Sequence, residues 1–331
     1  MRHGRLRRPG AGQARTTAPT EENAGVESPQ VEHVVTISVD ALAVKAIRKL
    51  GRKGTPTLHR MAREGAYTLN ARTAREQNIT LPNHASMVTG RRINKARGGH
   101  GVTWNVDRAH DTLQKASGDP DIESMFSIAH RADLRTAIFA GKSKFDLFTD
   151  SWPAAFDRQV IRNDHSVGSA KLVAKAVKHL VRRHPHLSFL HLPAPDAAGH
   201  AHGGMSKRYL KAVRAVDKSL AAVLAAIESD QVLRDSTLVV LTADHGVTSG
   251  HKNHTAHRRG NYTVPFIIWG TGVDHGDLYA LNPHLANPRR TRPGYAGPQP
   301  VRNLQLAAVA LEALGLPELD PRDIDGHELD W

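Results

Sequence analysis

The stretch from Thr237 to Gly246 constrains the fold more than any other part of this 331-residue chain. It begins with Thr-Leu-Val-Val-Leu-Thr, an apolar run rich in β-branched residues, which is typical of a strand buried on both faces of a parallel sheet. Asp244, His245 and Gly246 follow this run. A carboxylate and an imidazole at the carboxyl end of a buried strand need a partner, because burying them unpaired is costly. A divalent cation is one such partner, and a turn or helix-cap role for the aspartate is the alternative.

The same arrangement occurs twice more along the chain. The apolar run 34–39 ends directly in Asp40, and the run 187–192 is followed by Asp196. If three buried strands each bring an aspartate to one edge of a sheet, three like charges meet there. Such a cluster is unstable unless cations lie between the carboxylates. The repetition therefore favours a metal centre over three unrelated turns.

Composition limits the classes of protein that remain. No apolar run approaches the ~20 residues needed to span a membrane. The chain has no cysteine, which excludes disulfides, thiolate metal sites and a cysteine nucleophile. The formal charge of +13 attracts phosphate-bearing partners. However, there is no Lys/Arg run with interleaved aromatics, so we expect a solvated basic surface and no stable complex with nucleic acid.

Residues 1–30 and the rest of the chain differ in pattern. The first segment mixes Arg, Gly, Ala, Pro, Thr and Glu without apolar periodicity, which predicts a disordered basic tail. It lacks the apolar segment of a signal peptide. Residues 31–331 have the length and apolar content of one large α/β domain.

Predicted strands and helices alternate within residues 31–331. Besides the three runs above, we predict strands at 67–71, 134–140 and 264–269. We predict helices at 41–50, 55–64, 122–131, 167–183, 206–229 and 303–314. This alternation is typical of a mostly parallel sheet covered by helices on both faces. Residues 270–300 are rich in Gly and Pro and are expected to form an irregular loop that borders a pocket.

The acidic strand ends and nearby histidines divide into two predicted metal sites. Asp196 and His200 are four residues apart, so a helix or a tight turn brings them together. Asp40 with Asp244 and His245 form the second set. The first site needs another histidine, for which we favour His254 over the alternatives His251 and His257. Nitrogen and oxygen ligands with several imidazoles suit Zn²⁺, with Mn²⁺ or Fe as alternatives, whereas Mg²⁺ would use fewer histidines.

A nucleophile is predicted in the segment 78–90. Thr80 precedes Pro82 and is expected at the N-cap of a short helix that Gly90 ends. A hydroxyl at the positive end of a helix is well placed for a phosphate oxyanion, and metal coordination would lower its pKa. The alternative is that Thr80 only caps the helix. Ser86 and Thr89 are weaker candidates because they fall inside the helix.

Five motifs in this order resemble the type I phosphodiesterase/nucleotide pyrophosphatase family of the alkaline phosphatase superfamily. They are Ser38-Val-Asp40, Thr80-Leu-Pro-Asn-His84 with Val88-Thr-Gly90, His100-Gly-Val, Pro195-Asp-Ala-Ala-Gly-His200 and Thr242-Ala-Asp-His-Gly246. The resemblance spans residues 38 to about 270. It implies an alkaline-phosphatase-like α/β three-layer sandwich. Relatives of this kind are often exported, so export stays open.

The resemblance also implies roles for individual residues. Two zinc ions are expected. The first would be held by Asp196, His200 and His254, and the second by Asp40, Asp244, His245 and the nucleophile Thr80. Asn105 is implied as a donor to a phosphate oxygen. Lys142 and Lys144 resemble lysines that some relatives, including phosphonate hydrolases, carry near the pocket, and a surface role is the alternative.

We therefore expect a metal-dependent hydrolase of small-molecule phosphate esters, acting on diesters or nucleotide pyrophosphates through a threonine nucleophile. Because neutral imidazoles are the ligands, activity should fall below pH ~6.5. A phosphomonoesterase, phosphonate hydrolase or sulfatase-like enzyme on the same fold is the first alternative. The missing cysteine excludes a sulfatase that makes formylglycine from it. A non-catalytic phosphate or nucleic-acid binder is the second alternative.

Overall fold

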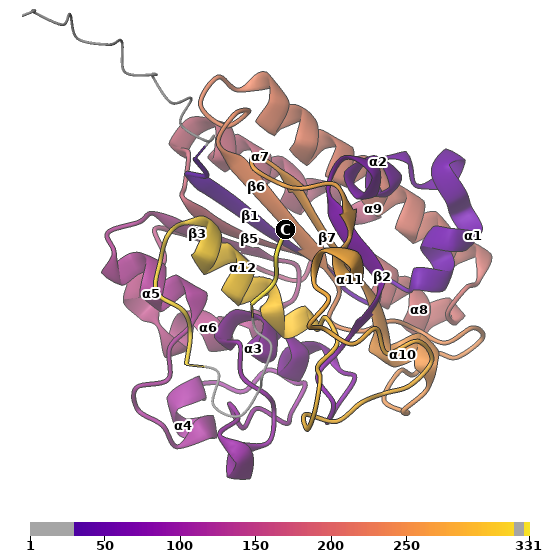
Figure 1. Ribbon diagram of the computed structural model, residues 1–331, viewed down its shortest axis with the longest axis horizontal. Coiled ribbons are helices and arrows are strands. Elements are labelled where there is room, and N and C mark those ends of the chain that lie inside the picture. Colours follow the sequence, from indigo (N-terminus) through magenta and orange to yellow (C-terminus); the bar gives the residue numbers. More distant parts are fainter. Residues whose placement is uncertain (1–29, 321–327) are drawn as a thin grey trace, which may run out of the picture.

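A computed structural model describes residues 30–320 and 328–331. Its centre is a mixed sheet in the order β4-β3-β5-β1-β6-β7-β2-β8 (Figure 1). The strands are β1 (His33–Val39), β2 (Ala66–Arg72), β3 (Thr136–Ala140), β4 (Arg158–Ile161), β5 (Leu187–Leu192), β6 (Thr237–Thr242), β7 (Thr263–Gly270) and β8 (Gly276–Asp277). From β4 to β6 neighbouring strands are parallel, whereas β7 is antiparallel to both β6 and β2. The predicted tail lies, apart from Gln30, outside the described residues.

Helices cover both faces of this sheet, so the predicted α/β three-layer sandwich is confirmed (Figure 1). One layer contains α3 (Thr80–Thr89), α5 (Met125–Arg131) and α12 (Leu306–Ala313). The other contains α1 (Val44–Gly54), α2 (Pro56–Glu64), α7 (Ala170–Arg183), α8 (Ala194–His202) and α9 (Lys207–Ser229). Shorter helices are α4 (Leu113–Ser117), α6 (Asp146–Ser151), α10 (Arg259–Tyr262) and α11 (Leu278–Leu281). None of the helices in the described ranges is both long and apolar enough to cross a membrane.

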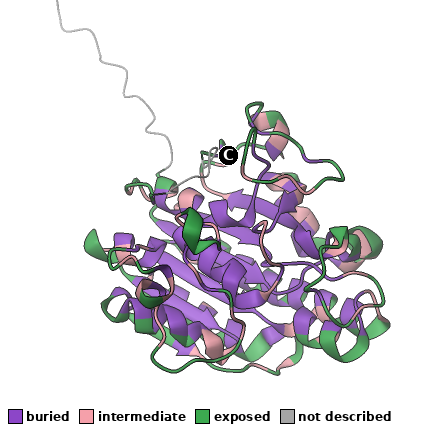
Figure 2. Ribbon diagram, turned by 90° about the horizontal axis from the view of Figure 1, so that it is seen from below, coloured by how far each residue is buried: buried purple, intermediate pink, exposed green. Residues whose placement is uncertain are grey.

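The buried core follows the central strands, and exposure rises toward the outer helices and loops (Figure 2). Every residue of β1, β5 and β6 is buried, as expected for strands covered on both faces. Helix α9 shows how the outer layer is attached. Its apolar residues recur at intervals of three or four and are buried, and the Ser206 Oγ accepts a hydrogen bond from the Tyr209 backbone N–H at the helix start. The single domain predicted for residues 31–331 stays a prediction.

Most predicted elements are present with shifted ends, and the exceptions have physical causes. Strand β4 was not predicted, because this edge strand is half exposed and lacks an apolar run. Helix α7 begins at Ala170 rather than at residue 167, because Gly168 takes a left-handed φ of 62°. Thr80 is the first residue of α3 and not its N-cap, which is Ile79. The predicted irregular loop 270–300 includes the short β8 and α11.

Candidate active site

Three adjacent parallel strands converge on the candidate active site. Strand β1 lies between β5 and β6, and the backbone of Ser38 is level with His191 on one side and Thr242 on the other. Residues that follow these strands therefore emerge together at the carboxyl edge of the sheet. Asp40 follows β1 directly and Asp244 lies just beyond β6, and both are fully buried. Strand order, which cannot be read from one sequence, produces this convergence.

Asp40, Asp244 and His245 form an inner group, with one ligand atom from each lying within 4.8 Å of the others. His245 Nε2 is 3.4 Å from Asp40 Oδ1 and 3.2 Å from Asp244 Oδ2. In the described part of the chain these three atoms are buried and have no hydrogen-bond partner. Unsatisfied buried polar atoms are costly, and here they face one another. Two carboxylate oxygens and an imidazole nitrogen fit a divalent cation such as Zn²⁺.

The remaining atoms of the inner group are held by the backbone. Asp244 Oδ1 accepts hydrogen bonds from the Ala41 N–H at 3.1 Å and the His245 N–H at 2.8 Å. His245 Nδ1 donates to the Gly246 carbonyl at 3.0 Å, which fixes the tautomer that leaves Nε2 as a ligand. Gly246 has no room for a side chain, because a Cβ there would lie 2.2 Å from the Gly260 carbonyl oxygen. The ligand atoms are therefore preoriented.

Burial and like charge push the pKa values of the inner carboxyls apart. Burial, followed by the charge of Asp40, raises the pKa of Asp244 well above its ordinary range. Burial would raise the pKa of Asp40 as well, but the Lys142 charge and the His191 hydrogen bond outweigh it and hold that pKa well below the usual value. Burial lowers the pKa of His245 to about 3, so this ligand stays a neutral imidazole.

Asp196, His200 and His254 form an outer group, with one ligand atom from each again within 4.8 Å of the others. Helix α8 places Asp196 and His200 one turn apart, and their Oδ1 and Nε2 atoms are 3.3 Å apart. His254 Nδ1 donates to the Asn78 carbonyl at 2.7 Å, and its Nε2 lies 3.5 Å from Asp196 Oδ1 and 3.2 Å from His200 Nε2.

The three histidines considered for the outer group are separated by the fold. His254 lies in the group and its ring stacks on that of His245, with ring centroids 3.6 Å apart. His251 contacts the guanidinium of Arg258 instead, and His257 contacts that of Arg292. The structure thus brings the favoured histidine, and neither alternative, to Asp196 and His200.

Lys142 links the two groups. This residue follows β3, and its ammonium is 2.6 Å from Asp40 Oδ2, 2.7 Å from Asp196 Oδ2 and 3.4 Å from Thr80 Oγ1. Its side chain is only 17% exposed, so a surface role is wrong for Lys142. Burial alone would lower the pKa of Lys142, but the Asp40 and Asp196 carboxylates outweigh it and raise that pKa above its ordinary value. An ammonium is therefore present between the carboxylates.

Thr80 is the hydroxyl that lies beside these groups. As the first residue of α3 it makes no side-chain cap, and its hydroxyl accepts from Lys142 Nζ. The other hydroxyls of the segment are engaged elsewhere, since Ser86 bonds to the His100 ring and Thr89 donates to the Ala85 carbonyl. Gly90 ends α3 with a left-handed φ of 67°, as its sequence position predicted.

Asn105 lies next to the start of α3. Its side-chain Oδ1 accepts hydrogen bonds from the Leu81 N–H at 2.9 Å and from Lys144 Nζ at 3.3 Å. With the oxygen occupied in this way, the amide N–H groups of Asn105 are the donors available to a ligand beside Thr80.

Three supporting residues were given no role by sequence reasoning, although Ser38 and His84 belong to the motifs named above. His191 accepts from the Gly141 N–H at 3.2 Å and donates through Nε2 to Asp40 Oδ2 at 2.9 Å. Ser38 donates to His84 Nε2 at 2.7 Å, and His84 Nδ1 donates to the Thr80 carbonyl at 2.8 Å. For Ser38 and His191 the available signal was a hydroxyl or imidazole one residue before the end of a predicted buried strand.

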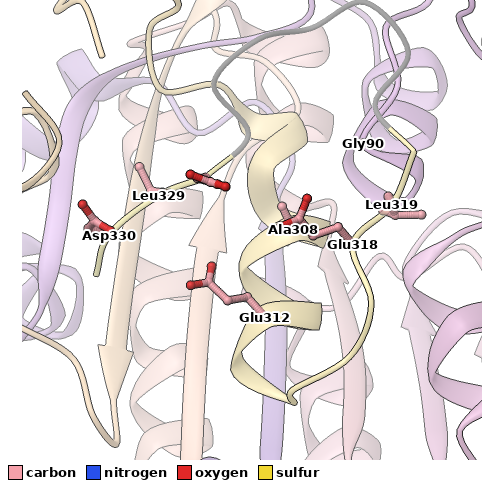
Figure 3. A pocket seen from close by; sticks show the side chains of 8 residues that line it. Gly90, Ala308, Glu312, Glu318, Leu319, Leu329 and Asp330 are labelled. Atoms are coloured by element: carbon pink, nitrogen blue, oxygen red, sulfur yellow. The ribbon is translucent and has the colours of Figure 1, made fainter. Parts of the chain in front are cut away.

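A separate acidic pocket lies between α12 and the C-terminal segment (Figure 3). Its lining includes the carboxylates of Glu312, Glu318, Glu328 and Asp330. Neither metal-ligand group includes any of them. A phosphate would be repelled there, because the described lining has four carboxylates and no cationic side chain, whereas the candidate active site includes the Lys142 ammonium.

Comparisons with known proteins identify the family of the chain. A model of the family described as type I phosphodiesterase / nucleotide pyrophosphatase matches residues 34–295. Curated relatives include GPI ethanolamine phosphate transferase 1 of Chaetomium globosum, which is 32% identical over 165 residues, or 49% of this chain and 17% of that protein. The chain spans less than a quarter of the length of the curated relatives it matches.

Solved structures with the same fold have low sequence identity to this chain. A protein in the alkaline phosphatase superfamily from Vibrio parahaemolyticus has a TM-score of 0.60 and 16% identity, covering 90% of this chain and 69% of that one. Murine ectonucleotide pyrophosphatase / phosphodiesterase 5 in complex with AMP has a TM-score of 0.57 and 16% identity, covering 88% and 97%. The fold is thus that of the alkaline phosphatase superfamily, and with the family model matched from residue 34 to residue 295 the chain belongs to the type I phosphodiesterase / nucleotide pyrophosphatase family.

Proposed function

We propose that this chain is a metal-dependent phosphodiesterase in which Thr80 forms a covalent phosphothreonine and water then releases it. One observation carries the proposal: three buried ligand atoms without hydrogen-bond partners converge at the strand ends, where Lys142 contacts both Asp40 and the Thr80 hydroxyl. A divalent cation would coordinate these atoms and offset the repulsion between the buried carboxylates.

The two groups would each hold one divalent cation, for which we propose Zn²⁺. The inner cation would be held by Asp40, Asp244 and His245 together with the Thr80 hydroxyl, and the outer one by the Asp196 group. Bound there, the cations would lower the pKa of the Thr80 hydroxyl and offset the negative charge of the phosphate. Asp40, Asp196 and Asp244 act as ligands in this scheme, and not as general acids.

In the first half of the reaction the Thr80 oxygen attacks phosphorus and loses its proton to solvent. The bond from phosphorus to the leaving alcohol breaks, and the alcohol oxygen is protonated by water. In the second half water attacks phosphorus, and the bond to Thr80 breaks with return of a proton to the hydroxyl. The Lys142 ammonium, 3.4 Å from Thr80 Oγ1, balances the charge of the phosphate, and the Asn105 amide donates to one of its oxygens.

Transfer to an alcohol is the second candidate, and the relatives named GPI ethanolamine phosphate transferase favour it. The first half of the reaction is the same. The two candidates differ only in whether water or an alcohol accepts the phosphoryl group from Thr80. A phosphomonoesterase, a phosphonate hydrolase and a sulfatase-like hydrolase differ instead in the ester that enters the site.

The test compares bis(p-nitrophenyl) phosphate with p-nitrophenyl phosphate and p-nitrophenyl sulfate, before and after metal removal. We expect turnover of the diester above the other two, its loss with a chelator and its recovery with Zn²⁺. Added ethanolamine or glycerol distinguishes the acceptors, because hydrolysis yields p-nitrophenyl phosphate, whereas a transferase would join the p-nitrophenyl phosphoryl group to the added alcohol as a mixed diester. Faster turnover of the monoester or of the sulfate would refute the proposed substrate class.

A further inference from the structure

A second phosphate-attracting feature lies along α7, outside the residues assigned above. Two adjoining hollows of about 670 and 390 Å³ share Lys175 and together form what we call the α7 groove. One side is the exposed face of α7, and the other includes the start of β3, the edge strand β4 and the loop after it. Its basic residues are Arg135, Arg158, Arg162, Lys171, Lys175, Lys178, Arg182 and Arg183.

The positive charge of this groove is not neutralised by the protein. None of these eight side chains forms an ion pair with another described residue. The two carboxylates of the lining are occupied by backbone donors: Asp157 Oδ2 accepts from the Thr136 N–H at 2.7 Å, and Asp164 Oδ1 accepts from the Ser166 N–H at 2.9 Å. The pKa of His179 in the lining is lowered by burial and then by Arg158 and Arg183. With eight cationic side chains against two carboxylates, the groove is therefore a concave surface of net positive charge.

The spacing of the lysines matches an extended ligand. Lys171, Lys175, Lys178 and Arg182 lie four, three and four residues apart, so they form one stripe along α7. At about 1.5 Å of rise per residue the stripe is roughly 16 Å long. A single phosphate would contact one or two of these side chains, whereas a chain of phosphates would contact the whole row.

The groove also adjoins the candidate active site. Its loop after β4 hydrogen-bonds to the loop that carries Lys142: the Asp164 N–H donates to the Gly141 carbonyl at 3.0 Å, and the Ser143 N–H donates to Asn163 Oδ1 at 3.2 Å. One end of the groove thus lies beside the loop that carries Lys142.

The lining argues against nucleobases and against a membrane. It contains no Phe, Tyr or Trp among its described residues, so there is no platform on which bases could stack. A flat bilayer would touch the ridge of α7 but would not reach the cations of β4 across the hollow. A thin, flexible chain of phosphates meets both sides.

We propose that the α7 groove binds linear inorganic polyphosphate along the stripe from Lys171 to Arg182. The proposal rests on the groove and not on the chemistry at Thr80, so either can fail alone. Helix α9 supplies a matched control, because Lys207, Lys211, Arg214 and Lys218 repeat the same spacing, are exposed and line neither hollow.

The experiment measures binding of fluorescently labelled polyphosphate to the full chain by anisotropy, without added divalent cations because polyphosphate binds them itself. The variant K175E/K178E/R182E should bind at least about tenfold more weakly, with a log–log salt slope reduced by about 2. The control K211E/R214E/K218E makes the same charge change and should bind within about threefold of wild type. Circular dichroism and unchanged turnover of a small ester establish that both variants fold.

Equal losses in the two variants would overturn the proposal, because general charge rather than the groove would then explain binding. Tighter binding to oligodeoxythymidylate, or to vesicles of anionic phospholipid, would overturn the assigned ligand. If the glutamate variant does not fold, K175Q/K178Q with K211Q/K218Q as control asks the same question with half the charge change per site.

Discussion

The inner and outer metal-ligand groups differ in how well their atoms are satisfied without a cation. The side chains of Asp40, Asp244 and His245 have no exposure, and one ligand atom of each has no hydrogen-bond partner. In the outer group His200 is 51% exposed, and its Nε2 lies 3.2 Å from that of His254. Water and a shared proton can satisfy these outer atoms, whereas burial keeps water away from the inner ones.

This difference indicates an order of metal affinity. An inner cation would coordinate buried lone pairs that otherwise face one another without hydrogen-bond partners. It should therefore bind more tightly than the outer cation. The outer cation competes with water and with a proton on His200, whose pKa is raised by the hydrogen bond to Asp196. The two groups should therefore lose their metals separately when a chelator is added. The predictions below test that ranking, beginning with the largest effect.

Replacement of Thr80 should separate chemistry from metal binding. Thr80→Ala removes the proposed nucleophile and should lower kcat on a phosphodiester by at least about a thousandfold. Its metal content, measured by mass spectrometry of the desalted protein, should stay close to that of wild type because six other ligands remain. The matched control is Thr89→Ala in the same helix, which should retain turnover. Loss of activity in both variants would indicate that α3 as a whole had been disturbed.

Removal of one imidazole from each group should show directly which site binds its metal more tightly. His245→Ala is expected to lose the tightly held metal and about a hundredfold in activity, whereas His200→Ala should weaken only the outer site, by about tenfold. Metal content after graded chelation gives the readout, and activity at saturating Zn²⁺ provides a second one. If His200→Ala proved to remove the more tightly held ion, the proposed order would be reversed.

The sequence predicts these groups only in part, for reasons of topology. Asp40 and Asp244 can each be predicted as metal ligands from local sequence, because the apolar run that forms the strand and the aspartate that follows it are close together in the chain. That β1 lies between β5 and β6 is a property of the whole sheet. Asp196 follows the same rule, but its distance from Asp40 depends on that strand order. The fold class was predictable from alternation, whereas the half-exposed β4 gave no periodic signal.

Lys142 shows most clearly what the sequence alone cannot predict. Its position after a predicted strand is visible in the sequence, but its contact with Asp40, which lies 102 residues earlier, arises from tertiary packing. The same holds for the choice of His254 among three nearby histidines, which local spacing leaves open. A side chain at the end of a strand can be predicted from local sequence, whereas a contact across the sheet edge follows only from the tertiary structure.

Lys142 also provides a test of the interaction between the groups. Its ammonium contacts Asp40 and Asp196, so it partly neutralises both sites before metal binds. Lys142→Met should destabilise the metal-free protein by about 2 kcal/mol, because buried carboxylates lose their counter-charge. The same change should tighten metal binding, since no ammonium then competes for these oxygens. Urea unfolding without metal and titration calorimetry with Zn²⁺ measure the two effects.

Lys144→Met is the control, because Lys144 donates to Asn105 rather than to the carboxylates. Weaker metal binding by the Lys142→Met variant would mean that the ammonium supports the cations instead of competing with them.

The effect that should leave activity and metal affinity least changed concerns a buried imidazole that faces no metal ligands. Burial lowers the pKa of His100 to about 3, as it does for His245, and the His100 ring donates to Ser86 Oγ at 3.0 Å and accepts from the Val102 N–H at 3.1 Å. Below pH ~6.5 the unfolded chain binds a proton at this position that the folded chain does not. The stabilisation from neutral His100 is thus fully present above pH ~6.5 and is lost as pH falls toward 3.

His100→Gln should therefore reduce the slope of unfolding free energy against pH by up to about 1.4 kcal/mol per pH unit between pH 6 and 4.5, whatever its effect at neutral pH. Urea titrations at several pH values with saturating Zn²⁺ provide the slope, and the exposed His165→Gln serves as control. Bound metal keeps His245 neutral by coordination, whereas His100 depends on burial alone. An unchanged slope in His100→Gln would show that burial does not keep this imidazole neutral. Burial alone could then not be assumed to keep His245 neutral in the metal-free protein either.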